Sequence, residues 1–109
     1  MASFDDREKG YESKFAHDQE LEFKARVRRD KLVAQWVAPQ LGLSGAAAEA
    51  YGKSLTMSAH EKHHEDHLVA KVLKDLTDKG VSVSEHQLRK KVAALHDEAR
   101  KQIEADTKA

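Results

Sequence analysis

The stretch of the sequence with the clearest chemical potential is A-H-E-K-H-H-E-D-H, residues 59–67. Within it, His60, Glu61 and His64 satisfy H-E-x-x-H, in which two histidines one helical turn apart hold zinc and the glutamate acts as a general base. A helix would bring His63 and His67 together in the same way. Zinc-assisted hydrolysis is therefore the first chemistry to weigh against the rest of the chain.

The surrounding sequence argues against a catalytic zinc site. Such a site needs a third protein ligand, an open coordination position and a cleft that holds the substrate. A chain of 109 residues is too short for two lobes around a cleft. The nearest third ligands, Glu65, Asp66 and His67, would form only a surface chelate. We therefore expect the solvated start of a helix, with casual binding of zinc or nickel as the alternative, and no enzymatic activity.

A second candidate is the basic stretch K-A-R-V-R-R-D-K, Lys24–Lys31. On a helix, Arg28 shares a face with Lys24 or Lys31, and such a face can bind a phosphate or an acidic protein surface. The simpler interpretation is the solvated side of a helix. The sequence shows no Gly-rich phosphate loop, no G-x-S-x-G and no Ser/His/Asp arrangement. We predict no bound cofactor and no metal.

Composition excludes several classes of protein. The 19 basic and 19 acidic residues balance, which argues against a general nucleic-acid binder. No apolar run approaches the roughly 18 residues of a membrane-spanning helix, so no direct membrane insertion is expected. The charged N-terminus has no apolar signal region, and the absence of cysteine fits a reducing cytoplasm. One charged, helical domain is the expectation.

The clearest boundary between two helices lies at Gly80. Glycine takes the left-handed position after a helix without steric cost, and Val81 would then contact Leu76. Ser84 begins the next helix, and Gln87 can reach back to it in a capping box. The first half has similar signals, with Gly42 ending a helix and a serine at position 44 capping the next one.

We predict four helices, near residues 18–41, 45–56, 59–79 and 84–105. Ser58 and Glu61 are a possible capping box for the third. Pro39 should weaken or bend the end of the first helix without splitting it. Short connections make neighbours antiparallel, so the expected fold is all-α, a small four-helix bundle. Its predicted core consists of Phe23, Val27, Ala34, Val37, Leu41, Ala47, Ala48, Tyr51, Leu55, Leu68, Val69, Val72, Leu73, Leu76, Leu88, Val92, Leu95, Ala99 and Ile103.

The N-terminal residues carry an aromatic stripe of their own. At about 100° per residue, Phe4, Tyr11 and Phe15 fall within about 20° of one direction. The core positions of residues 23–41 centre about 100° away on the same scale. One straight helix cannot point both stripes into one core. Gly10 also opposes helix by about 1 kcal/mol, so this segment should be helical only when held. The alternatives are a frayed, charged terminus and an arm that folds into a groove on a partner.

Three segments resemble a known family. They are "MASFDDREKGYESKFAHDQELEFKARVRRDKL", "LGLSG" and "KGVSVSE", and together they look like the zeta-subunit family, the ATPase inhibitors of alphaproteobacterial F-type ATP synthases. The resemblance spans almost the whole chain. Residues 56–67 depart from the family pattern, which is often acidic there and lacks this histidine cluster, and Pro39 is another departure.

The resemblance implies a four-helix fold, residues 19–109, with a mobile inhibitory N-terminal arm, residues 1–18. The arm would insert at an interface between the alpha and beta subunits, reach the gamma shaft and block rotation in the hydrolytic direction. It implies a protein that is monomeric when free, cytoplasmic, and at the cytoplasmic face of the inner membrane when bound. The inhibitory residues would be Phe4, Asp5, Asp6, Arg7, Glu8, Lys9, Gly10, Tyr11, Glu12 and Phe15. The alternative function is a metal- or phosphate-binding helical module that uses His60–His67 or Lys24–Lys31.

Overall fold

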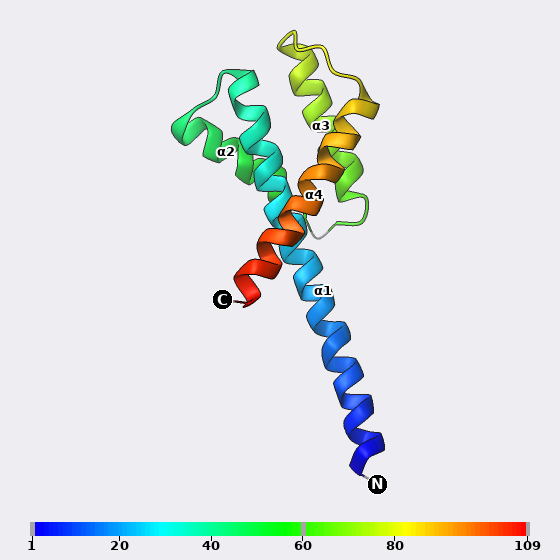
Figure 1. The fold of residues 1–109 in the computed structure, drawn as a ribbon. Coiled ribbons are helices and arrows are strands. Elements are labelled where there is room, and N and C mark those ends of the chain that lie inside the picture. Colours follow the sequence, from blue (N-terminus) through cyan, green and yellow to red (C-terminus); the bar gives the residue numbers. More distant parts are fainter. Residues whose placement is uncertain (1, 60, 109) are drawn as a thin grey trace.

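Four α-helices form the protein in the computed structural model, which describes the backbone of residues 2–59 and 61–108 and the side chains of residues 19–59 and 61–106. They are α1 (Ala2–Val37), α2 (Gly45–Thr56), α3 (His64–Asp78) and α4 (Glu85–Lys108). The other three helices gather around the second half of α1, and the first half projects away from them (Figure 1). The prediction of an all-α, four-helix fold is confirmed.

The first helix is longer at its start than predicted. It begins at Ala2 and not near residue 18, and it continues without interruption into the part that packs against the other helices. A helix that already exists adds residues without a new nucleation step, so the cost of Gly10, about 1 kcal/mol, does not stop it. We call residues 19–108 the body and residues 2–18 the arm.

Pro39 determines how α1 ends. The α-helix stops at Val37, and a 3₁₀ turn, Ala38–Leu41, carries the proline in its first turn. Proline has no N–H to donate, and the 3₁₀ turn begins where an N–H is not needed. Gly42 then takes a left-handed conformation, φ 77°, and donates its N–H to the Pro39 carbonyl at 3.1 Å. The predicted weakening at the helix end, without a break in the middle, is confirmed.

The connection from α3 to α4 follows the predicted signals closely. Gly80 is left-handed, φ 85°, and the Val81 N–H donates to the Leu76 carbonyl at 2.9 Å, which closes a Schellman turn. The Gln87 N–H donates to the Ser84 hydroxyl at 3.1 Å, and the Ser84 N–H donates to the Gln87 side chain at 3.0 Å. Both partners of the capping box are therefore in place.

The connection from α2 to α3 differs from the prediction. α3 begins at His64 and not at residue 59, because the chain first makes a tight turn in which the Glu61 N–H donates to the Ser58 carbonyl at 2.9 Å. His63 precedes the helix in a left-handed conformation, φ 67°, which is uncommon for a residue with a Cβ atom. Ser58 caps no helix; its hydroxyl group lies 3.0 Å from Nδ1 of His64. The predicted capping box at this position is wrong.

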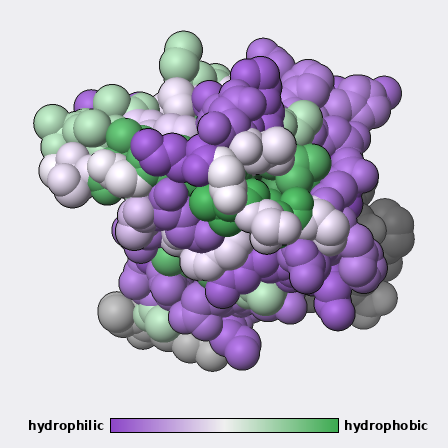
Figure 2. Space-filling model, turned by 90° about the horizontal axis from the view of Figure 1, so that it is seen from above, coloured by the Kyte–Doolittle hydropathy of each residue, from purple (hydrophilic) through white to green (hydrophobic). Residues whose placement is uncertain are grey.

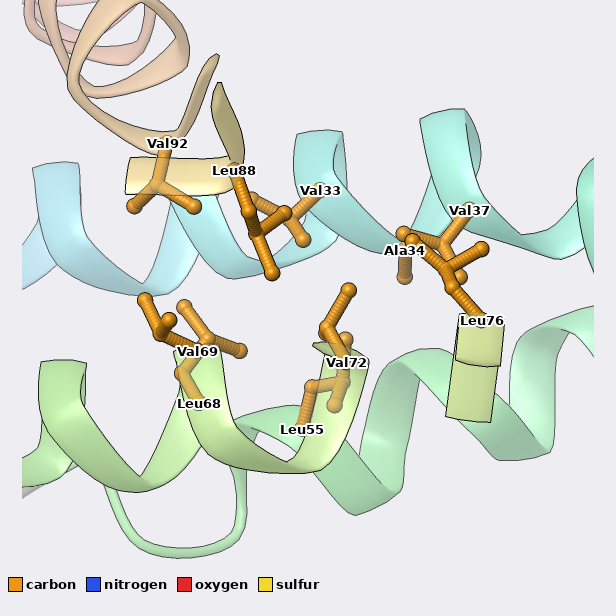
Figure 3. Packing of buried hydrophobic residues seen from close by; sticks show 10 residues of the cluster. All are labelled: Val33, Ala34, Val37, Leu55, Leu68, Val69, Val72, Leu76, Leu88 and Val92. Carbon is orange, nitrogen blue, oxygen red and sulfur yellow. The ribbon is translucent and has the colours of Figure 1, made fainter. Parts of the chain in front are cut away.

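The hydrophobic core lies where α3 and α4 meet the second half of α1 (Figure 3). Its centre is aliphatic and fully buried, with Val33 and Val37 from α1, Val69 and Val72 from α3, and Leu88 from α4. Seen from the end opposite the arm, the most hydrophobic residues gather in the middle of the body, most of the surrounding surface is hydrophilic, and one projecting side is weakly hydrophobic (Figure 2). Leu41, Leu73, Val81 and Val83 are partly buried residues that pack against the same core.

Most predicted core positions are buried, and the others are half-buried or, at Ala47, exposed. Phe23, Val27 and Leu41 are only half-buried, whereas Val33, which the predicted stripe omits, is completely buried. The first helix has α2, α3 and α4 packed around it. Its buried surface is therefore wider than the single predicted stripe, and the centre of that surface lies on a different side of the helix from the predicted one. Ala47, on the short helix α2, is exposed.

The serines that precede α2 and α4 provide a test of local stability. We predict that Ser84→Ala lowers the free energy of unfolding by about 1 kcal/mol, because it removes the hydroxyl that accepts from the start of α4. Ser44, the residue before α2, makes no side-chain capping bond and is the matched control, so Ser44→Ala should cost only a few tenths of a kcal/mol. Urea unfolding measures both. Equal losses would show that the capping box contributes nothing.

Candidate functional site

The arm leaves the body where the C-terminal half of α4 crosses α1 (Figure 1). Glu22 of α1 marks this point: its carboxylate lies 2.9 Å from Nε2 of His96 and 3.6 Å from the Arg100 guanidinium, both on α4. Two turns further along α1, Arg28 donates to Gln102 at 2.9 Å and to Asp106 at 3.0 Å. α4 therefore holds the base of the arm through polar contacts on its last turns.

A buried polar cluster holds the next part of α1 against the start of α3. The Asp30 side chain is completely buried, and its Oδ2 atom lies 2.6 Å from Nε2 of His64, which is 4% exposed. The other His64 nitrogen, Nδ1, lies 3.0 Å from the Ser58 hydroxyl. Arg29 donates from Nε to Oδ1 of Asp30 at 3.2 Å and from Nη1 to Glu65 at 3.1 Å. We call Ser58, Arg29, Asp30, His64 and Glu65 the Asp30 cluster.

The charges in the Asp30 cluster partly offset the cost of burial. Burial raises the pKa of the Asp30 carboxyl above its ordinary value of 3.8. The hydrogen bond with His64 and the charge of Arg29 act in the opposite direction but do not cancel this rise. A pKa that is higher in the folded chain favours the protonated form there. This contribution to stability is therefore complete below the ordinary pKa and is lost as the pH rises through the raised folded-state pKa.

The structure corrects two interpretations of the histidine segment. His64 was expected in a solvated helix start but is buried, and a Ser/His/Asp arrangement, expected to be missing, exists as Ser58, His64 and Asp30. It lacks the access that acyl transfer needs, because the histidine and the carboxylate are enclosed between helices. Both ring nitrogens of His64 are engaged inside the protein, so neither presents a lone pair to a zinc ion. The arrangement fastens α1 to α3.

The remaining members of the H-E-x-x-H segment do not converge. His63 and His67 are exposed and lie 3.9 Å from Asp66 and Glu61, respectively. In the part of the chain that the structure describes, no three His, Asp or Glu side chains come together as a metal site would require. His60 lies outside the described residues.

The basic stretch Lys24–Lys31 is divided between two sides of α1. Arg29 points inward to the Asp30 cluster and is 3% exposed. Lys24, Arg28 and Lys31 line a groove on the other side, beside the end of α4. Lys24 and Lys31 are exposed, as expected for the solvated side of a helix, whereas Arg29 in the same stretch is buried. Trp36, further along the helix, is partly buried against the core, with the Lys91 ammonium 5.6 Å from its ring centre.

Sequence reasoning missed the Asp30 cluster, although a signal for it exists. Asp30 stands three positions before Val33 and seven before Val37, in line with the most buried valines of α1. A charged residue at a core position needs a partner of opposite charge or a hydrogen-bond donor. The partner of Asp30 is His64. The position of His64 depends on the turn at His63, which the sequence did not predict.

The side chains of the predicted inhibitory residues lie outside the described part of the structure. They are Phe4, Asp5, Asp6, Arg7, Glu8, Lys9, Gly10, Tyr11, Glu12 and Phe15. Their backbone belongs to α1. Their individual roles and the division of the chain at residue 18 therefore stay predictions.

Fold and site together define a small helical protein that presents one long helix from an anchored base. The comparison with protein families identifies the class. A family model described as ATPase inhibitor subunit zeta matches residues 1–102, and the chain belongs to this family. Curated proteins and solved structures give no match. Among the described residues, every helix falls short of the length or apolar character needed to cross a bilayer.

The Asp30 cluster should dominate the polar contribution to stability. We predict that Asp30→Ala lowers the free energy of unfolding by about 3 kcal/mol, because Arg29 keeps its buried charge and loses one of its two carboxylate partners. Glu65 still contacts Arg29, which places the loss at the low end for a broken buried pair. His67→Ala, an exposed change in the same segment, should alter stability by less than about 0.5 kcal/mol. Thermal and urea unfolding of both variants measure this, and similar losses would contradict the buried arrangement.

Proposed function

We propose that the protein inhibits ATP hydrolysis by the F-type ATP synthase through direct binding to the catalytic head of the enzyme. The observation that carries this proposal is the family match over residues 1–102, which includes both the arm and most of the body. Binding to the synthase and inhibition follow from membership of an inhibitor family. The chain needs no catalytic activity of its own for this function.

The arm is the part of the chain suited to enter the enzyme. A single helix is about 10–12 Å across with its side chains, whereas the whole molecule measures 27 by 21 Å along its two shorter axes. An interface between alpha and beta subunits that is one helix wide would admit the arm and exclude the body. We propose that the arm inserts there, reaches the gamma shaft and blocks rotation in the hydrolytic direction while the body stays outside as a stopper.

Continuity of α1 lowers the cost of this insertion. A free peptide of 17 residues would have to nucleate its own helix before or during binding. The arm instead extends a helix that the core, α4 and the Asp30 cluster already hold in place. Each further helical residue then adds a hydrogen bond without a new nucleus, so less of the binding free energy is lost to ordering.

Residue types suggest how the arm would bind. Phe4, Tyr11 and Phe15 share one helical face and would serve as apolar anchors, because aromatic side chains bury about 150–250 Å² each. The charged residues of positions 5–9 and Glu12 would make polar contacts with the subunits. Phe15 lies closest to the body and is the anchor whose role depends most on where the interface ends.

The primary test adds the purified protein to the isolated catalytic head and measures ATP hydrolysis. We predict that the full chain inhibits and that deletion of residues 2–18 abolishes inhibition. The deletion should leave far-UV helicity per remaining residue and the melting of the body nearly unchanged, because the buried apolar side chains that the structure describes lie within residues 25–103. Unfolding of the deletion variant would show that the arm belongs to the core, and failure of the full chain to inhibit would refute the proposed function.

The anchors are tested one at a time. We predict that Phe4→Ala, Tyr11→Ala and Phe15→Ala each raise the half-inhibitory concentration at least tenfold, since truncating an aromatic hot spot costs about 2 kcal/mol. Body stability should change by less than about 1 kcal/mol. Met57→Ala is the control, because Met57 is 81% exposed on the body and should affect neither measurement. If all three variants inhibit like the parent, the stripe is incidental and the arm acts through its charges.

A further inference from the structure

A groove of about 570 Å³ runs along the base of the arm, between α1 and the end of α4. Its apolar lining comes from Leu21, Phe23 and Val27 of α1 and from Ile103 of α4. Its charged lining comes from Lys24, Arg28, Lys31 and Asp106. We call this surface the α1–α4 groove. An apolar lining edged by charges is typical of a surface that binds another protein segment.

The charge of the α1–α4 groove selects an acidic occupant. Its three basic side chains face one carboxylate, and Arg28 neutralises that carboxylate at 3.0 Å. Lys24 pairs only with Glu20, at 3.2 Å on the exposed surface, where such pairs contribute little. Within the described residues, the Lys31 ammonium makes no ion pair or hydrogen bond. Two lysines are therefore available to a partner's carboxylates.

The other side of the α1–α4 contact has the opposite balance. A second groove of about 540 Å³ shares Leu21 and Ile103 with the first, but its charged residues are Glu22, Glu104 and Arg100. An acidic segment that approaches the base of the arm would be attracted to one side and repelled from the other. Charge arranged in this way fixes the orientation of a partner more than it adds affinity.

Backbone geometry favours a helix as the occupant. Both walls of the α1–α4 groove are helices whose peptide groups bond within each helix, so the groove offers no open edge to a β-strand. Lys31 also borders a groove of about 330 Å³ between α1 and α2, lined by small residues such as Ala34 and Gly52. The two grooves share Lys31, and their α1 and 3₁₀-turn lining residues extend from residue 21 to 38, about 26 Å at 1.5 Å per residue. This length suits about five turns of an amphipathic helix.

We propose that the α1–α4 groove binds an acidic, amphipathic helix of the catalytic head, beside the point where the arm enters it. This inference rests on the proposed function and names the partner surface that the body contacts. Carboxylates of that helix would pair with Lys24 and Lys31, and its apolar face would cover Leu21 and Val27. The contact would set the depth and direction at which the arm is held.

The test reverses the charge of the groove in the full-length protein. Lys24→Glu combined with Lys31→Glu should raise the half-inhibitory concentration about tenfold and weaken the dependence of binding on ionic strength. Lys90→Glu combined with Lys101→Glu is the matched control, because both are exposed α4 lysines outside the groove and the change in net charge is identical. The control pair should inhibit like the parent, and thermal melts confirm that both variants fold.

A second measurement uses the parent protein and does not depend on any variant. Carbodiimide joins a lysine ammonium to a carboxylate in direct contact, and mass spectrometry then identifies the joined peptides. Links from Lys24 or Lys31 to an acidic helical segment of the head would support the inference. Links to a non-helical segment, or to a second copy of this chain, would overturn it. If the parent and the groove variant inhibit equally well, the inference about the groove is also overturned. If the parent does not inhibit at all, the proposed function itself is refuted.

Discussion

The placement of the long helix depends on the buried contact between Asp30 and His64. The contact joins residues 34 positions apart at 2.6 Å, and both side chains are enclosed. A buried carboxylate can be accommodated only where donors meet it, and Arg29 and His64 meet it from α1 and α3. Sliding α1 along α3 by one turn would separate these groups and leave each one buried without its partner. The cluster therefore specifies the register of the two helices, which valine and leucine contacts alone specify less sharply.

The remaining contacts of α1 follow from this register. With Asp30 fixed, Val33 and Val37 point into the core, and Arg28 points to the end of α4. Glu22 then meets His96 and Arg100 of α4 near the base of the arm. Three sets of contacts, at Glu22, Arg28 and Asp30, hold the turns of α1 that follow the arm. The point at which the arm leaves the body and its direction are therefore defined.

Local signals made most of the fold predictable from the sequence, and long-range contacts set the limit. Gly80 and the Ser84 capping box act within a few residues, so their positions could be read directly, and the structure confirms both. His64 was assigned to a solvated helix start because nothing within a few residues shows that Asp30 lies opposite. The left-handed residue of the turn before α3 is His63 and not a glycine, so the sequence gives no local signal for this turn. The inhibitory residues could be named only through the family resemblance, since residue types and spacing gave an aromatic stripe without a partner.

The two parts of α1 have sequences of different character, which fits the two purposes proposed for them. From residue 25 to residue 37, one side of α1 is buried by its own chain, and small or β-branched residues such as Ala25, Val33 and Ala34 suit close packing. Before residue 19, the sequence consists mainly of charged and polar residues, which favour contact with water, and of three aromatic residues, which together would expose an apolar stripe if no partner covered them. The base of the arm is held first at Glu22 and Arg28, whose partners lie on α4, and then at Asp30, whose partner His64 begins α3. Among the described residues, the interhelical ion pairs are concentrated on these turns of α1, and such an anchored base is what the proposed insertion of the arm would require.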